Sequence, residues 1–219
     1  MKIKNFRIAI VIILIQIILS LYLGLSLPAD ARVPSHWNLQ GEIDDWSGKW
    51  TAIFLFPGIN IGMLLLVIFF PSLSPRYRKD PERFQKIMPA FINILVFFFA
   101  VIHAYTLLLA REVVPSSSHF ILILIGLMFV CLGNLMPKIP SNFYLGVRLP
   151  WTLSSENVWR KTHRIAGWSF SLGGVIFIII GFVGEETSAV QIILIAAFLL
   201  IVLVPTLSAF LIYKKEQKG

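Results

Sequence analysis

Six predominantly apolar runs, each about as long as a bilayer-spanning helix, constrain this chain more than any other feature. The hydrocarbon layer of a membrane is about 30 Å thick, so a helix that rises about 1.5 Å per residue needs about 20 apolar residues to cross it. Strands of a membrane barrel would instead alternate apolar and polar residues. The sequence therefore predicts an all-α integral membrane protein with six transmembrane helices, at residues 8–27, 51–71, 88–110, 119–136, 165–183 and 189–213.

The composition agrees with this fold class. The chain has 219 residues, of which 57% are hydrophobic, and its mean hydropathy of +0.82 exceeds that of a soluble domain of this size. The first run follows Lys2, Lys4 and Arg7, as a signal peptide would, but it is too long and lacks a small-residue cleavage site, so we expect a retained helix. The single cysteine, Cys131, excludes an intrachain disulfide.

Positive charges predict the orientation of the helices, because short loops rich in Lys and Arg remain in the cytoplasm. All but three of the 19 Lys and Arg residues fall at the termini or in the second and fourth loops; the exceptions are Arg32, Lys49 and Arg111. Both termini are therefore predicted to be cytoplasmic. The net charge of +8 then reflects topology and anionic lipid headgroups, and it requires no direct nucleic-acid partner.

Two connections are longer than the others and rich in Trp, Pro and Asn, which makes them the places to look for function. The chain is predicted to be one six-helix membrane domain over residues 1–219, with an extracellular loop at 28–50 and a cytoplasmic loop at 137–164. In the cytoplasmic loop Ser154 suits a helix N-cap and Glu156 suits the first turn, which predicts a short interfacial helix.

The predicted interfacial helix has two faces. Val158 and Trp159 are expected to point toward lipid. The polar residues expected to meet water or phosphate are Asn157, Arg160, Lys161 and Arg164. Anchoring at the membrane explains such a helix, and a docking surface for a partner is the alternative.

The extracellular loop contains three tryptophans and a local excess of acidic residues, in the stretch VPSHWNLQGEIDDWSGKW. An acidic and aromatic surface suits a cationic or amphipathic ligand, and a lid that caps the bundle is the alternative. The two long loops also share the spacing W-x-L-x-x-E, which begins at Trp37 and at Trp151. Because the two halves of the chain have opposite predicted orientations, a 3+3 inverted repeat is a further hypothesis.

Polar and small residues inside the runs are expected to join helices. Gln16, Asn60 and Asn93 are candidates for interhelical hydrogen bonds. Small residues that would let helices approach closely recur at helical spacing: Gly58, Gly62, Gly167, Ser171 and Gly174. His36 and His103 belong to no zinc motif, and no nucleophile elbow is present, so no metal, other cofactor or enzymatic activity is predicted.

The two long loops resemble two known patterns. The stretch VPSHWNLQGEIDDW resembles the P-x-H-W-N-x-x-G-x-x-D pattern of a small membrane module of undefined role. The stretch NFYLGVRLPWTLSSENVWRKTHRIAGW resembles the signature of the SdpI-type bacterial immunity family, in which G-[IV]-R-x-P-W-T-L precedes E-x-V-W and a T-H-R run. The patterns occur in this order in that family, and the resemblance covers essentially the whole chain. Leu149 departs from the signature, where threonine is common.

The resemblance implies a multi-pass protein of the bacterial cell membrane that protects its producer against a secreted, membrane-active peptide toxin. For some members it also implies a receptor that draws a cytosolic winged-helix repressor of the ArsR type to the membrane when toxin is present. Expected partners are therefore membrane lipids, the toxin and such a repressor. A transporter or exporter with the same six helices is the alternative, with a binding cavity lined by Asn60, Asn93 and His103.

The candidate site residues fall in the two long loops. Those expected to face the toxin are His36, Trp37, Asn38, Gly41, Asp44, Asp45 and Trp46. Those expected to form the cytoplasmic signature are Gly146, Arg148, Pro150, Trp151, Thr152, Glu156, Trp159, Arg160, Lys161 and Arg164. Binding outside would bias the bundle between two packings and change what the cytoplasmic loop presents, which is the hypothesis that joins the two surfaces.

Overall fold

The computed structural model of the chain describes residues 1–38, 42–73, 75–79, 81–184 and 187–218. Six helices in this part of the chain are long and apolar enough to cross a membrane, which confirms the predicted all-α membrane fold. They are α1 (Arg7–Leu25), α2 (Lys49–Leu73), α4 (Pro81–Ala110), α5 (Ser118–Leu135), α7 (Glu156–Val183) and α8 (Ser188–Glu216).

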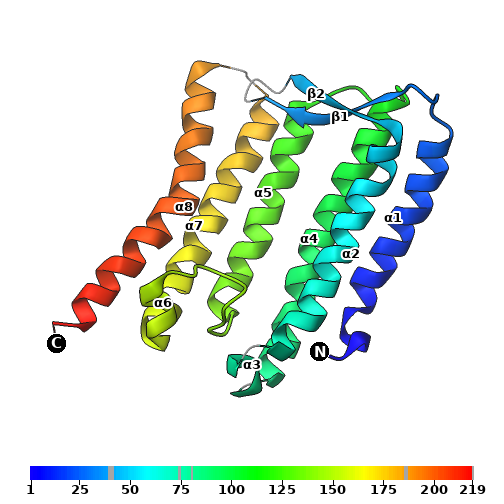
Figure 1. The fold of residues 1–219 in the computed structure, drawn as a ribbon. Coiled ribbons are helices and arrows are strands. Elements are labelled where there is room, and N and C mark those ends of the chain that lie inside the picture. Colours follow the sequence, from blue (N-terminus) through cyan, green and yellow to red (C-terminus); the bar gives the residue numbers. More distant parts are fainter. Residues whose placement is uncertain (39–41, 74, 80, 185–186, 219) are drawn as a thin grey trace.

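The shorter elements lie at the two ends of the bundle (Figure 1). The strands β1 (Arg32–Trp37) and β2 (Ile43–Gly48) form an antiparallel hairpin, and we call that end of the bundle the hairpin end. Both chain termini lie at the opposite end, which we call the termini end. The remaining short helices are η1 (Ile3–Phe6), α3 (Pro75–Lys79), η2 (Met136–Lys138) and α6 (Pro150–Ser154). The cytoplasmic location of the termini stays a prediction.

Side-chain caps and one glycine mark several helix ends. Ser117, Ser155 and Thr187 precede α5, α7 and α8, and each accepts a hydrogen bond from a backbone N–H in the first turn of its helix. Gly184 ends α7 with φ 74°, a left-handed conformation that glycine adopts without steric cost. Pro205 lies inside α8, which bends in Figure 1, because proline cannot donate the helical hydrogen bond.

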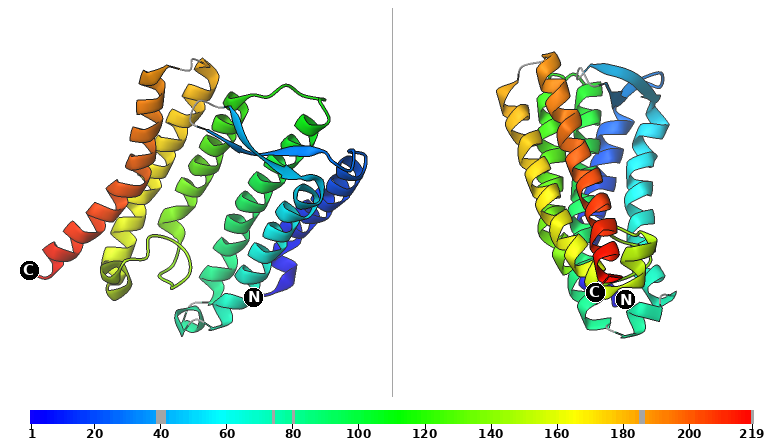
Figure 2. Two further views of the ribbon diagram at one scale, coloured as in Figure 1. Left: turned by 45° about the horizontal axis from the view of Figure 1, so that its top comes forward. Right: turned by 90° about the vertical axis from the view of Figure 1, so that its left-hand side faces the viewer.

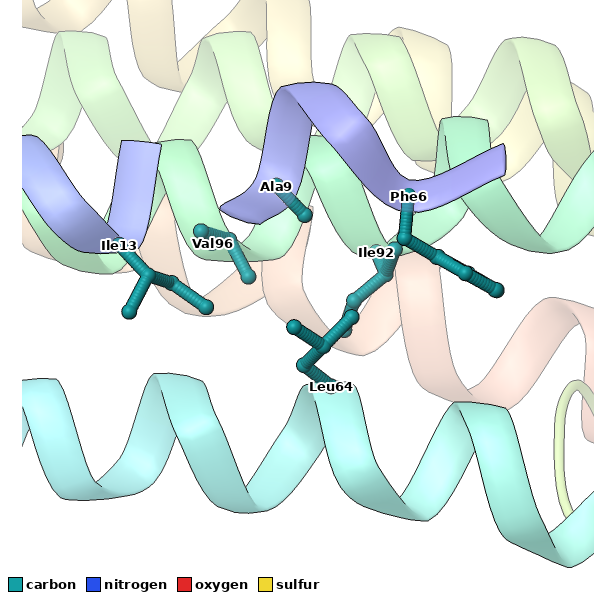
Figure 3. Close-up of a cluster of buried hydrophobic side chains, with 6 residues drawn as sticks. All are labelled: Phe6, Ala9, Ile13, Leu64, Ile92 and Val96. Carbon is teal, nitrogen blue, oxygen red and sulfur yellow. The ribbon is translucent and has the colours of Figure 1, made fainter. Parts of the chain in front are cut away.

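The N-terminal half packs through large apolar side chains. Phe6, Ala9 and Ile13 meet Leu64 of α2 together with residues of α4 (Figure 3). A second cluster, nearer the hairpin end, joins the end of α1 to β1, α2 and α4. Helices α1, α2 and α4 all contact one another, and β1 rests on α4 and α2. Figure 2 shows the hairpin lying across their ends.

The C-terminal half packs through glycines, with α7 in contact with both α5 and α8. A Cβ added at Gly174 would lie 2.6 Å from the carbonyl oxygen of Gly126, and one added at Gly167 would lie 2.9 Å from that of Gly133. The close approach predicted for this row is therefore confirmed. The same prediction is wrong for Gly58 and Gly62 of α2, where an added Cβ would meet no atom within 4 Å.

Two predicted helix starts were too late, since α4 begins at Pro81 and α7 at Glu156. The prediction of a separate interfacial helix is wrong, because this segment forms the first turns of α7. Its N-cap is Ser155 rather than Ser154. No glycine or proline interrupts the chain between these turns and the apolar run, so one helix continues through both. The inverted repeat stays a prediction; its two similar segments begin in a strand at Trp37 and in a helix at Trp151.

Candidate functional surfaces at the two ends of the bundle

The hairpin carries an exposed polar surface at one end of the bundle. The His36 Nδ1 atom lies 2.6 Å from Asp44 Oδ1, and these side chains are 66% and 42% exposed. Asp45 is also exposed, and its Oδ1 accepts a hydrogen bond from the backbone N–H of Trp46. The Trp46 ring is itself 42% exposed. The predicted extracellular loop thus folds as a hairpin rather than as an extended loop.

Two other residues predicted to face the toxin have structural roles. Asn38 binds Glu42 through its side chain and its backbone, which ties the strands together where the hairpin turns. Trp37 stacks on Tyr105 of α4 with ring centroids 6.3 Å apart, and its Nε1 is buried. Trp37 therefore anchors the hairpin to the bundle. Gly41 lies outside the described residues.

Lys49, at the start of α2, is a second anchor of the hairpin end, a role that its charge alone did not predict. Its Nζ donates to the backbone carbonyl oxygens of Leu25 and Leu27, at 3.1 and 2.5 Å. These carbonyls lie at and just beyond the C-terminus of α1, where a cation complements the helix dipole. The side chain is mostly buried and also lies 5.6 Å from the Trp50 ring centroid.

A buried polar cluster joins α1, α2 and α4. The Asn60 side-chain amide donates to Gln16 Oε1 at 2.8 Å, and the Gln16 amide nitrogen lies 3.3 Å from His103 Nδ1. Gln16 must then donate to this ring nitrogen, which leaves the imidazole proton on Nε2. Asn60 also donates to the carbonyl oxygen of Val96. These residues form the predicted interhelical hydrogen bonds, whereas Asn93 is only half-buried.

His163 holds the part of the signature that precedes α7, residues 142–155, which lies at the termini end and which we call the signature segment. The backbone N–H of Val147 donates to His163 Nε2 at 3.1 Å, and Nδ1 lies 2.8 Å from the carbonyl oxygen of Trp159. Because the first partner can only donate and the second can only accept, the ring is neutral with its proton on Nδ1. Gly146 has φ 100° and leaves room for this ring, since an added Cβ would collide with Nε2.

Asn142 and Thr152 satisfy the backbone of the same segment. Asn142 accepts from the N–H groups of Tyr144 and Leu145 and donates to the carbonyl oxygens of Pro140 and Leu145. Thr152 Oγ1 accepts from the N–H of Leu149 at 2.8 Å, which caps α6. These bonds explain why an irregular segment keeps one conformation. Burial raises the pKa of the Tyr144 phenol, so this side chain stays neutral.

Two tryptophans of the signature, Trp151 and Trp159, are packed against other parts of the chain. Trp159 is buried, donates from Nε1 to the carbonyl oxygen of Ile139 at 2.9 Å and stacks on His163 with centroids 4.0 Å apart. Val158 is also fully buried, so the prediction that it and Trp159 face lipid is wrong. Trp151 makes an edge-on contact with the Phe210 ring of α8. Helix α7 turns this face inward because α5 and η2 pack against it.

A cleft of about 590 Å³ opens beside this segment, and three arginines from three helices line it. They are Arg76 of α3, Arg83 of α4 and Arg160 of α7. Arg76 donates to Ser141 Oγ and to the carbonyl oxygen of Leu153, both at 2.5 Å, and so ties α3 to the segment. Glu156 also lines the cleft.

The remaining signature residues are exposed at the termini end. Pro150 begins α6, where its missing N–H costs no helical hydrogen bond. Arg148 donates to the carbonyl oxygen of Phe143 and also lines a groove of about 380 Å³ formed mainly by apolar residues of α2 and α4. Lys161 and Arg164 are exposed on α7.

The structure thus divides the predicted site residues into exposed and buried sets. Among the described residues, no three His, Cys, Asp or Glu side chains lie together as a metal site would require.

Sequence reasoning missed the roles of Asn142, His163 and Arg76. A turn signal at Asn142 was available, since asparagine often binds backbone two residues ahead. Nothing local to Arg76 indicates its partners, which lie 65 and 77 residues away, and nothing local to His163 indicates that its ring accepts from the Val147 N–H, 16 residues away.

Comparisons with known proteins cover both long loops. Residues 138–209 match the model of the SdpI/YfhL protein family, and residues 11–61 match that of a domain of unknown function, DUF1648. The first match includes the whole signature stretch, residues 142–168, and the second includes the hairpin. The Immunity protein SdpI of Bacillus subtilis (strain 168) is 25% identical over 213 residues, which are 97% of this chain and 97% of that protein. No solved structure matches the chain.

Proposed function

We propose that this chain belongs to the SdpI/YfhL protein family and is a membrane immunity protein, which protects the bacterium that makes it against a secreted, membrane-active peptide toxin. The similarity to Immunity protein SdpI carries this proposal, since it extends along 97% of both chains. The six apolar helices make the protein a multi-pass protein of the cell membrane, where such a toxin acts. The proposed role is binding rather than catalysis.

The exposed side of the hairpin is the proposed toxin-binding surface. Asp44 and Asp45 supply carboxylates, and Trp46 supplies an exposed aromatic ring beside them. This combination suits a cationic, amphipathic peptide, because its charges meet the carboxylates and its apolar face meets the ring. Trp37 contributes indirectly, since it anchors the hairpin to α4.

The exposed cations at the termini end are the proposed docking surface for a cytosolic repressor of the ArsR type. Arg148, Lys161 and Arg164 carry it. Helix α4 offers a mechanical link between the two ends, because Tyr105 near one end holds Trp37 while Arg83 near the other lines the cleft. A toxin changes the docking surface only if it binds two packings of the bundle with different affinity.

Survival of a sensitive bacterium tests the immunity role directly. Cells that express this chain should survive graded doses of an SDP-type peptide toxin that kill cells with an empty vector. The Asp44→Asn, Asp45→Asn double variant should lose much of this protection, whereas Glu82→Gln, which removes an exposed carboxylate at the termini end, should keep it. Absence of protection by the intact protein, with normal membrane abundance, would contradict the proposal.

Reporter fusions test the orientation on which both surfaces depend. A reporter placed after Arg78 should be cytoplasmic, and one placed after Glu186 should be extracellular. The reverse result would put the hairpin in the cytoplasm and exclude it as a toxin-binding surface.

Repressor recruitment is tested separately from protection. Lys161→Glu reverses an exposed charge at the proposed docking surface and should abolish recruitment of the repressor to membranes while protection remains. Loss of both activities at normal abundance would show that the two surfaces are not separate.

A further inference from the structure

The proposed function leaves the groove between α2 and α4 unexplained, which we call the α2–α4 groove. Its volume is about 380 Å³. Most of its wall consists of apolar side chains of these two helices: Met63, Leu66 and Val67 of α2, and Met88, Phe91, Ile92 and Leu95 of α4. Within each helix these residues recur at spacings of three and four, so each helix turns one continuous apolar stripe toward the groove.

The signature segment supplies the rest of the lining, with Tyr144, Leu145 and Arg148. Arg148 is the one charged residue among those found to line the groove. Its side chain is exposed, and it donates to the carbonyl oxygen of Phe143, which is a neutral acceptor. Among the described residues, no Asp or Glu forms an ion pair with Arg148. The guanidinium group therefore keeps its positive charge and further N–H groups for an anionic ligand.

The charges of α4 place the α2–α4 groove in one leaflet of the membrane. Lys86 is the last charged residue before the apolar run of this helix, and the groove begins at Met88. From Met88 to Leu95 the helix rises about 10 Å, whereas half of the hydrocarbon layer is about 15 Å thick. The apolar wall therefore lies among the acyl chains of the leaflet at the termini end, and Arg148, in the signature segment, lies toward the headgroups of that leaflet.

The volume of the α2–α4 groove excludes a helix as its occupant. One helical turn, about 5.4 Å long and about 10 Å wide with its side chains, occupies about 420 Å³. The groove, with about 380 Å³, holds less than one such turn. A hydrocarbon chain is narrower and flexible. Met63 and Met88 suit such a chain, because unbranched methionine side chains adapt to irregular shapes.

We propose that the α2–α4 groove binds an anionic phospholipid, with one acyl chain against the two helices and the phosphate on Arg148. A guanidinium group can donate two parallel hydrogen bonds to phosphate oxygens. This site goes beyond the proposed function, since it requires neither a toxin nor a repressor. Lys161 and Arg164 are not among the residues found to line the groove and remain available to the proposed docking surface.

Binding of lipids to the purified full chain in a neutral detergent, measured by native mass spectrometry, tests the role of Arg148. The protein should bind phosphatidylglycerol about tenfold more tightly than phosphatidylcholine with the same acyl chains, because choline neutralises the second lipid. Arg148→Gln should abolish this preference. Lys161→Gln removes the same charge at the same end but outside the groove, and it should keep the preference. The same preference in both variants, or the same loss, would overturn the proposal.

A second pair of variants tests the position of the acyl chain. Leu66 and Leu65 are neighbours on α2 and are 52% and 46% exposed, but only Leu66 is among the residues found to line the groove. Leu66→Trp should fill part of the groove and weaken the binding of phosphatidylglycerol by about tenfold. Leu65→Trp should leave it unchanged. Equal affinities of the two variants would show that the chain lies elsewhere and would overturn the proposal.

Two other occupants give distinct results in the same experiments. Glycerophosphoglycerol, the headgroup without acyl chains, should not displace phosphatidylglycerol at equal concentration; displacement would assign the affinity to phosphate alone. A dimer that retains no phosphatidylglycerol and that Leu66→Trp disrupts would assign the groove to a second copy of the chain. Either result would overturn the proposal.

Thermal unfolding of the intact protein needs no substitution and covers the case in which a variant does not fold. Phosphatidylglycerol at about 100 times its dissociation constant should raise the melting temperature by roughly 5–10 °C, and phosphatidylcholine at the same concentration should raise it less. Equal shifts from the two lipids would contradict the proposal. Because no toxin or repressor is present, these results do not depend on the proposed immunity role.

Discussion

The two long loops share a sequence spacing but keep their conformations by different means. In the hairpin, the backbone groups of β1 and β2 form hydrogen bonds with each other. The side chains of His36, Asp44 and Trp46 are therefore not needed for this purpose, and they remain exposed. In the segment that precedes α7, side chains satisfy the backbone instead, chiefly those of Asn142 and Thr152, with His163 as a third. Several motif residues are therefore left exposed in the first loop, whereas motif residues largely serve structure in the second.

This difference changes how the signature should be interpreted. Gly146, Thr152 and Trp159 form the scaffold that positions the cleft and the exposed cations. A substitution that abolishes function at one of these positions reports on folding unless abundance is measured as well. Arg148, Lys161 and Arg164 are exposed and are the better positions at which to test contact with a partner.

The largest difference in stability between the two loops is expected when one glycine in each is replaced by alanine. Gly146→Ala places a side chain at φ 100° and against His163, and should destabilise the protein by about 2–4 kcal/mol. For a chain of this size that lowers the melting temperature by roughly 4–16 °C. Gly48→Ala in the hairpin meets no atom within 4 Å and should change stability by less than about 0.5 kcal/mol. Similar melting temperatures for the two variants would contradict the contrast.

A smaller difference in stability is expected between substitutions of His163, which holds the signature segment, and of Tyr105, which stacks on Trp37 of the hairpin. His163→Phe keeps an aromatic ring on Trp159 but leaves the Val147 N–H and the Trp159 carbonyl without their partner, at a cost of about 2–3 kcal/mol. Tyr105→Phe keeps the stacking on Trp37 but removes the oxygen that accepts from the Ser117 N–H at 2.7 Å, at a cost of about 1 kcal/mol. Melting temperatures in the same detergent compare the two. A larger loss from Tyr105→Phe would show that the hairpin end depends more on side-chain bonds.

The smallest effect on stability is expected at the exposed contact between His36 and Asp44 of the hairpin. His36→Asn should leave the melting temperature unchanged at both low and high salt, because a contact between two exposed side chains contributes little and any attraction between charges there is screened. Protection against toxin should nevertheless fall if this surface binds the peptide. A drop in melting temperature similar to that of Tyr105→Phe would show that the pair is part of the scaffold.

The helices were predictable because the bilayer imposes a local rule. Any run of about 20 apolar residues satisfies it, so six spans and their approximate positions follow from the sequence. The starts of α4 and α7 were less predictable, because a helix continues past the apolar run wherever nothing breaks it. The hairpin was missed because its strands are short and polar and their turn has no strong two-residue signal.

The candidate sites were predictable as segments but not as geometry. The motifs located both long loops correctly, yet they did not indicate that Trp37 and Trp159 point inward. Whether an amphipathic ring faces lipid, water or protein depends on which helices pack beside it, and the spacing of residues within one segment contains no such information.

The sequence by itself determined the number of membrane helices, their order and the similarity to the SdpI/YfhL protein family, because each depends on composition or on a contiguous pattern. Only the tertiary structure decided that His163 accepts from the Val147 N–H, that Gln16 joins Asn60 to His103 and that three arginines line one cleft. These arrangements depend on hydrogen bonds and packing between residues far apart in the chain, which form only when the helices assemble.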